Sequence, residues 1–216
     1  MDNLNKPVRV FFKKIGRAKY ISHLDLQRTM QRAIKRSALP VWETEGFNPH
    51  IYLTFALPLS LGIESLCESF DIKIAEDISF DEIRDRLNAA LTEDLQILKA
   101  AAPAYKHTEI KKAEYEITLK SEESNWDNFS VFLNQNEIIA AKRTKKGETK
   151  IDLKPLIELK SINDGGKINL LLPAGTTLNI NPKQVIDAYG DFTGVNINNA
   201  SVTRTAVFCA DGAEFH

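Results

Sequence analysis

The sequence contains only two cysteines, Cys67 and Cys209, which stand far apart without a CxxC pair or a Cys/His ladder. This excludes a disulfide framework and a zinc site of the usual ligand spacing, and the expected location is a reducing cytoplasm. No P-loop, GxGxxG or HExxH motif is present, and no serine, cysteine or lysine shows a catalytic signature. We therefore expect neither a metal nor a cofactor.

Long hydrophobic runs are also missing. No stretch approaches the roughly 18 to 20 apolar residues that a membrane helix requires, and Met1 to Lys6 has no apolar centre like that of a signal peptide. The apolar fraction of 43% and the charged fraction of 26% are typical of a soluble globular protein. We expect a soluble, unexported protein with one large domain or two small ones.

Charge of either sign is unevenly distributed, although the net charge is only −1. The segment from Arg9 to Arg36 holds nine lysines and arginines and one acid, whereas Glu64 to Asp94 holds ten acids and three basic residues. The distribution of charge therefore indicates more about binding partners than the net charge does.

The first half of the chain shows the periodicities of a β-α-β-β-α-β unit. Residues 8–16 favour a strand, Ser22 offers an N-cap to a helix that Pro40 must end, and 41–47 favour a short strand. Residues 48–62 favour a long connection that includes a strand fragment at 51–56, after which 66–75 favour a strand, 79–91 a helix with Ser79 and Glu82 in capping-box spacing, and 95–104 a strand. This order predicts a ferredoxin-like unit over residues 1–104, four antiparallel strands backed by two helices.

The same order recurs over residues 105–216. After a linker, 113–120 favour a strand, 124–135 a helix, 138–157 a hairpin, 167–173 a strand, 182–190 a helix with Pro182 at its first position, and 195–208 a strand. The predicted fold is therefore α+β, with two tandem ferredoxin-like units and antiparallel sheets.

One long segment resembles a known family. The run SHLDLQRTMQRAIKRSALPVWETEGFNPHIYLTFALPLSLGIES joins Ser22-His23-Leu24-Asp25 to Gly46-Phe47-Asn48-Pro49-His50, and KRTKKGETKIDLKPLI follows later. With these segments the chain resembles the radical-SAM-linked proteins, a family of unknown function also called the DUF2344 family. Ile51 departs from the family pattern, in which a proline more usually follows the histidine.

The resemblance implies a partner, because members of that family are encoded beside, or fused to, radical S-adenosylmethionine (SAM) enzymes. This chain lacks the CxxxCxxC motif that holds the cluster of such an enzyme, so it is not the radical enzyme itself. At the level of the fold, tandem units with a basic hairpin are also similar to RNA-binding and RNA-cleaving proteins of CRISPR systems.

Basic residues gather in three places that could bind phosphate groups. The helix from Ser22 has cations on the face opposite Leu26 and Met30, and loops around Gly16 and Gly147 carry further cations. The candidate nucleic-acid-binding residues are Lys13, Lys14, Arg17, Lys19, Arg28, Arg32, Lys35, Arg36, Asn48, His50, Lys142, Arg143, Lys145 and Lys146. The alternative for the helix is a solvated face neutralised by Glu43 or Glu45, and for the second loop a solubility-promoting lysine hairpin.

Three further side chains are candidates for acid/base chemistry. His23 and Asp25 fall in the first turn of the basic helix, and His50 ends the Gly46–His50 turn. The alternatives are that Asp25 completes the helix cap, that His23 bonds a neighbouring loop, and that Asn48 stabilises a structural turn.

Three functions are compatible with these patterns. The favoured one is an accessory RNA-binding protein that presents RNA, with transfer RNA and ribosomal RNA as candidates, to a separate radical SAM enzyme. The second is a metal-independent RNA-processing enzyme that uses His23 or His50. The third is a scaffold that docks on the radical SAM partner without any nucleic acid.

Overall fold

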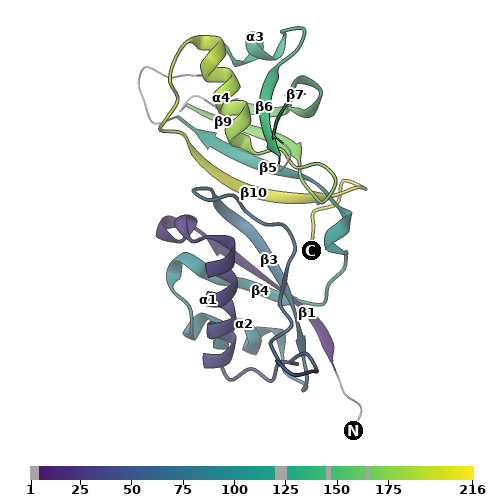
Figure 1. Cartoon of the computed structure of the whole chain (residues 1–216). Helices are drawn as coiled ribbons and strands as arrows, with labels where there is room; N and C mark the ends of the chain where they lie inside the picture. The colour runs from purple at the N-terminus through teal and green to yellow at the C-terminus, as the bar shows by residue number, and fades with distance from the viewer. Residues whose placement is uncertain (1–4, 120–125, 145–146, 164–165) are drawn as a thin grey trace.

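One sheet runs through both halves of the chain. The computed structural model describes residues 5–119, 126–144, 147–163 and 166–216. Within them, seven strands follow the order β4-β1-β3-β10-β5-β9-β8, and β2 pairs with β3 as an eighth. Figure 1 shows the first half below and the second half above, with β3 and β10 meeting between them.

The first half supplies three long or medium strands, one very short strand and two α-helices. They are β1 (Lys6–Lys14), α1 (His23–Arg36), β2 (Thr54–Phe55), β3 (Glu64–Ile74), α2 (Phe80–Ala89) and β4 (Ile97–Ala101), with short 3-10 turns η1 (Gly16–Tyr20) and η2 (Glu93–Leu95). Neighbours in the order β4-β1-β3-β2 are all antiparallel. The element order agrees with the prediction, but residues 41–47 form only isolated bridges, Val41 to Ile74 and Glu43 to Ile51, and not the predicted strand.

Local sequence signals fix both helices of this half. The Ser22 hydroxyl accepts a hydrogen bond from the Asp25 backbone N–H, and Ser79 does the same for Glu82. These serines satisfy donors that a helix leaves open at its start. The inward face of α1 buries Leu26 and Met30, as the helical period predicts.

The second half contains six strands and two α-helices. They are β5 (Ile110–Thr118), α3 (Phe129–Leu133), β6 (Ile139–Thr144), β7 (Gly147–Asp152), β8 (Glu158–Asn163), β9 (Lys167–Pro173), α4 (Pro182–Thr193) and β10 (Ser201–Cys209), with 3-10 turns η3 (His107–Glu109) and η4 (Lys154–Leu156). Pro182 begins α4, as predicted. The strand β8 was not predicted; it pairs with β9, while β6 and β7 form a separate two-stranded sheet.

The prediction of a mixed α and β fold with mostly antiparallel strands is therefore confirmed for the described residues. The antiparallel pairing predicted within each half is found, whereas β3 and β10, which join the halves, run parallel, with Thr203 opposite Glu64 and Arg204 opposite Ser65. This short parallel pair turns the strands of the two halves into one sheet. No helix in the described part of the chain is long and apolar enough to cross a membrane.

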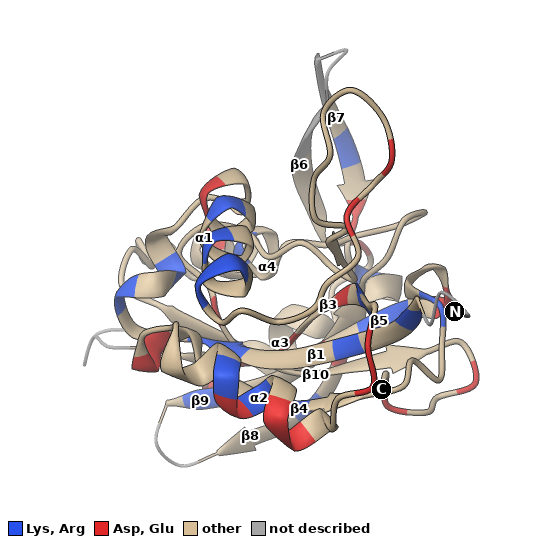
Figure 2. Cartoon of the chain, turned by 90° about the horizontal axis from the view of Figure 1, so that it is seen from below, with Lys and Arg blue, Asp and Glu red and all other residues tan. Residues whose placement is uncertain are grey.

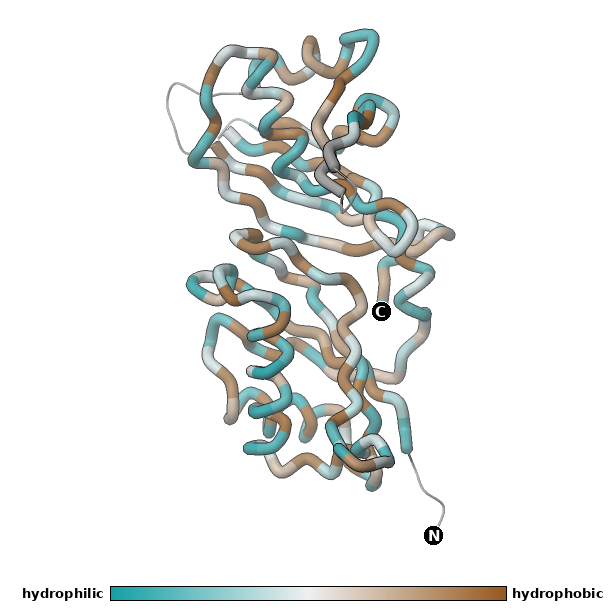
Figure 3. Tube along the Cα trace, in the orientation of Figure 1, coloured by the Kyte–Doolittle hydropathy of each residue, from teal (hydrophilic) through white to brown (hydrophobic). Residues whose placement is uncertain are grey.

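Each half has its own cluster of buried apolar side chains. Val10, Met30 and Ile83 belong to the first cluster, and Tyr115, Phe129 and Tyr189 belong to the second. In Figure 3 hydrophobic stretches recur along the strands, and the outward turns of α1 are hydrophilic. The loop before β3 crosses between the clusters, since it inserts Leu57 and Ile63 into the second one.

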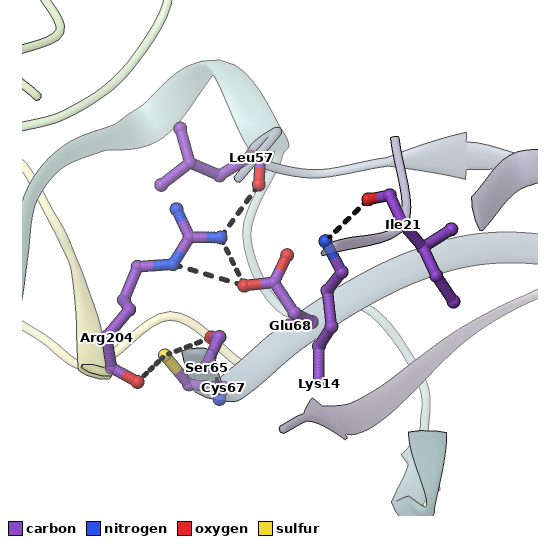
Figure 4. A network of polar contacts seen from close by, with 7 residues as sticks. All are labelled: Lys14, Ile21, Leu57, Ser65, Cys67, Glu68 and Arg204. Atoms are coloured by element: carbon purple, nitrogen blue, oxygen red, sulfur yellow. Dashed lines mark hydrogen bonds and ion pairs between the residues drawn. The ribbon is translucent and has the colours of Figure 1, made fainter. Parts of the chain in front are cut away.

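Charged side chains are buried where the halves meet (Figure 4). Arg204 of β10 is 1% exposed and Glu68 of β3 is 3% exposed. Arg204 donates to the Glu68 carboxylate from Nε at 3.1 Å and from Nη2, and Nη2 also donates to the Leu57 carbonyl at 2.9 Å. Burial alone would lower the pKa of Arg204, but the Glu68 carboxylate holds that pKa above its ordinary value, so the guanidinium stays charged.

Two more groups extend this polar cluster. Lys14 of β1 is buried and donates from Nζ to the Ile21 carbonyl at 3.0 Å. Burial lowers the pKa of Lys14, against the opposing effect of the Glu68 carboxylate. Cys67 lies beside the Arg204 backbone, and burial raises the pKa of its thiol to about 11.

A second buried arginine ties the C-terminal segment to the first half. Arg9 of β1 donates from Nε and Nη2 to the Asp71 carboxylate at 2.8 and 2.9 Å. Its Nη1 donates to the backbone carbonyls of Tyr105 and His216, and its guanidinium lies over the Phe215 ring. The chain that leaves β10 is thereby held against β1.

Glu68→Gln should destabilise the protein by about 3–5 kcal/mol, because Arg204 would stay buried without a compensating charge. The free energy of unfolding, measured in urea, gives the size of the loss. Asp77→Asn is the matched control, since it breaks the exposed Lys6–Asp77 ion pair and should change the stability little. Equal effects of the two substitutions would contradict the structural role of the buried pair.

Lys14→Met should change how stability depends on pH. Because the pKa of Lys14 is lower in the folded protein than its ordinary 10.5, the unfolded chain binds more protons between those two pKa values. The wild type should therefore gain stability relative to the variant as pH rises towards 10.5. Urea unfolding at several pH values tests this, and parallel pH profiles for the two proteins would show that Lys14 is not perturbed.

Candidate functional site

The outward face of α1 is the most basic helical surface among the described residues. Arg28, Arg32, Lys35 and Arg36 are all exposed there. Figure 2 shows the blue bands of α1 on the same side of the sheet as the hairpin β6–β7. The predicted helix face therefore exists, and a ligand lying across this side of the molecule could meet both elements.

Two of these arginines have partners within the protein. Arg28 lies 3.4 Å from the Asp25 carboxylate, a long contact on an exposed surface. Arg36 donates from Nη2 to the Ala90 carbonyl at the end of α2, at 2.8 Å. Arg86 of α2 donates to the Ala38 carbonyl just beyond α1. Each of the two helices therefore has an arginine that donates a hydrogen bond to a carbonyl at the C-terminal end of the other.

Arg32 and Lys35 differ from their neighbours. Neither side chain forms an ion pair or hydrogen bond with any residue that the structure describes. Neutralisation by Glu43 or Glu45, the alternative offered by the sequence, is not found among the described contacts. Arg32 and Lys35, with Arg28 beside them, are therefore the cations of α1 most available to an anion.

Two of the four predicted cations in the basic loop around Gly16 make contacts within the protein and are not free to bind a ligand. Lys14 is buried, and Lys19 pairs with Glu64 at 3.0 Å. Strand alternation places Lys13 on the face of β1 away from α1. Of the four predicted cations in this loop, only Arg17 is exposed without a described side-chain partner.

The need for a glycine at position 16 is explained by a neighbouring carboxylate, and it requires no bound phosphate. Its φ of 56° lies in the left-handed region, and a Cβ at this position would meet the Asp94 carboxylate oxygen at 2.7 Å. The neighbouring backbone N–H of Arg17 donates to the same carboxylate at 3.1 Å. The glycine thus permits close approach of Asp94 to the loop.

The second basic cluster belongs to the hairpin. Lys142 and Arg143 are residues of β6, paired with Thr149 and Glu148 of β7. Lys145 and Lys146 lie outside the described residues. Gln184 of α4 donates to the Ala141 carbonyl at 3.2 Å, which fixes the base of the hairpin to α4.

Asn48 and His50 form a closed turn. The Thr44 backbone N–H donates to the His50 carbonyl at 2.8 Å, and the His50 backbone N–H donates to the Thr44 hydroxyl at 3.2 Å. The His50 Nδ1 lies 2.9 Å from that hydroxyl and 3.2 Å from the Asn48 carbonyl. These bonds give the His50 side chain a structural role, while Asn48 contributes only its backbone carbonyl, and the exposed acids Glu43 and Glu45 beside the turn disfavour phosphate binding there.

His23 and Asp25 are separated from His50. Asp25 completes the N-terminal cap, since its carboxylate accepts a hydrogen bond from the Ser22 hydroxyl at 2.7 Å. The His23 ring packs edge-on against Phe55, which lies opposite Phe70 of β3. The segment that leads to the His50 turn begins at Val41, which lies opposite Ile74 of β3. Ile74 is four residues, or about 13 Å, beyond Phe70 along that strand.

The two histidines therefore do not share one catalytic site in this structure. Within the described ranges there is also no group of three or more His, Cys, Asp or Glu side chains that could hold a metal ion. The arrangement supports binding of an anion along α1 better than it supports acid/base chemistry.

Comparison with known proteins places the sequence in a family. No curated protein matches the chain. One family model matches residues 7–182, a range that includes α1, the turn at His50, the buried Glu68 and the hairpin β6–β7. Because this match covers most of the sequence, the chain belongs to the DUF2344 family, which is described as an uncharacterised protein conserved in bacteria.

Proposed function

We propose that this protein is an accessory RNA-binding protein that presents RNA to a separate radical SAM enzyme. One observation carries the proposal: Arg28, Arg32 and Lys35 line the exposed face of α1, and only Arg28 has a described acidic partner. Transfer RNA and ribosomal RNA are the candidate ligands.

Electrostatics favours a phosphate chain over other anions. Arg28 and Arg32 are four residues apart, and like charges at that spacing destabilise a helix by a few tenths of a kcal/mol. A row of phosphates would relieve this repulsion, and guanidinium groups bind phosphate oxygens in pairs. Neighbouring cations at this spacing are about 6 Å apart along the helix axis, which suits successive anionic groups of one strand.

The hairpin offers a second contact on the same side. Lys150 of β7 is exposed, and Lys142 and Arg143 stand in β6. We propose that the two halves are tandem ferredoxin-like units, 1–104 and 105–216, and that the basic elements of both contact one RNA. The strand orders β4-β1-β3-β2 and β10-β5-β9-β8 support this proposal, because each is the order of a split βαβ sandwich.

The radical SAM partner is proposed from the family resemblance. The chain has no CxxxCxxC motif, so the radical chemistry would belong to another protein. A scaffold that docks on this enzyme without RNA remains the competing function, and it is distinguished by the response to competitor RNA.

The double variant Arg32→Ala/Lys35→Ala should bind a fluorescently labelled transfer-RNA pool about tenfold more weakly than the wild type. Fluorescence anisotropy at several salt concentrations measures both the affinity and its salt dependence. Three phosphate contacts on α1 predict a slope of about −2 in log affinity against log salt for single-stranded contacts, and the variant should lose roughly two-thirds of it.

Lys99→Ala/Lys111→Ala is the control, because it removes two exposed cations from β4 and β5 at positions not predicted to bind RNA. It should leave the affinity close to the wild-type value. Equal binding by both double variants, or no binding by the wild type, would refute the proposal and favour the scaffold.

A further inference from the structure

Apolar side chains are exposed at the N-terminal end of the cationic row. Leu24 is 54% exposed and occupies the position four residues before Arg28, so it continues the row Arg28 to Arg32 towards the start of α1. Tyr20 of η1, four residues before Leu24, is 67% exposed. Ile21 and Ser22, between Tyr20 and α1, are extended, so Tyr20 lies beside the start of α1 and not on its helical row.

The backbone beneath Tyr20 is held firmly. The Gly62 backbone N–H donates to the Lys19 carbonyl at 2.9 Å, and Lys19 pairs with Glu64. On the other side, Lys14 donates to the Ile21 carbonyl from the buried cluster. Lys19 Nζ also lies over the Tyr20 ring, 5.5 Å from its centroid, so Tyr20 is an exposed ring on a fixed support with a cation beside it. Leu61, next to Gly62, is also 64% exposed.

Single exposed apolar residues are ordinary, but three around one end of a cationic row indicate a contact surface. A duplex keeps its bases stacked inside and exposes phosphates and sugars. Its phosphates would bind the cations, but it would offer no base on which the Tyr20 ring could stack. A single strand offers phosphates and exposed base faces together, and aromatic side chains stack on such bases in single-strand binders.

We infer that α1 and η1 form a site for single-stranded RNA, in which Arg28, Arg32 and Lys35 bind the phosphates and Tyr20 stacks on an unpaired base. The inference rests on the proposed function and specifies its ligand. Leu24 lies between Tyr20 and Arg28 in the sequence, and in this site it would supply an apolar contact to the sugar or base. Tyr20 is then the residue that distinguishes unpaired from paired RNA.

The experiment compares three labelled probes: a strand of about twelve nucleotides without self-pairing, the same strand with abasic positions, and its blunt duplex. Wild-type protein should bind the intact strand about tenfold more tightly than either other probe. Tyr20→Ala should lose this preference and bind all three probes alike, with unchanged affinity for the duplex. Tyr20→Phe keeps the ring and should retain the preference.

Phe47→Ala is the matched control, because it removes a fully exposed ring from the turn near His50 and should leave the preference intact. If Tyr20→Ala still prefers the intact strand, or if the wild type binds all three probes equally, the inference fails while RNA binding stands. If the folded wild-type protein binds none of the probes, the proposed function fails and the inference fails with it.

Discussion

The buried ion pair between Arg204 and Glu68 determines how the two halves of this protein fit together. Their strands meet through only two described residue pairs between β3 and β10, so backbone pairing alone constrains the joint weakly. A buried guanidinium without its carboxylate is far less stable than the pair, and any slip of β10 along β3 would separate them. Together with the contacts of Arg9 to the C-terminal segment, the pair fixes the strands on which the two halves are built, and α1 and the hairpin stand on the same side of the sheet (Figure 2).

Features with local causes could be predicted from the sequence. Ser22, Ser79 and Pro182 mark helix starts through bonds or torsion angles that involve only the next few residues. The strand β8 was missed although the Asn163–Gly166 stretch is rich in turn residues, because a hairpin earlier in the sequence already completed the expected pattern. The parallel contact of β3 with β10 could not be predicted, since it depends on residues almost 140 positions apart.

In the candidate site, too, the sequence predicts the features with local causes and misses those that depend on distant residues. The helical period correctly places Arg28, Arg32 and Lys35 on the exposed face of α1. The helical period cannot distinguish these three residues from Arg36, whose guanidinium donates to the Ala90 carbonyl. Nor can the sequence pattern distinguish the buried Lys14 from a surface lysine, because the contacts that decide these roles depend on the tertiary structure. A charged residue at an inward position of a strand, such as Arg204 between Val202 and Val207, is a signal that a buried partner exists, but it does not identify that partner.

The net charge is close to zero because acidic and basic residues are nearly equal in number, but they are segregated along the chain. No lysine or arginine occurs between Ser37 and Lys73, and the acids of α2 largely pair with Arg84 and Arg86 on the same helix. Among the described helices, α1 is therefore the surface on which we propose that an anion binds, and its 14 residues span only about 21 Å. A surface of this length would hold a few nucleotides, so the proposed RNA binding would need contacts beyond charge to be selective. We propose that the aromatic ring beside α1 and the hairpin on the same side supply them.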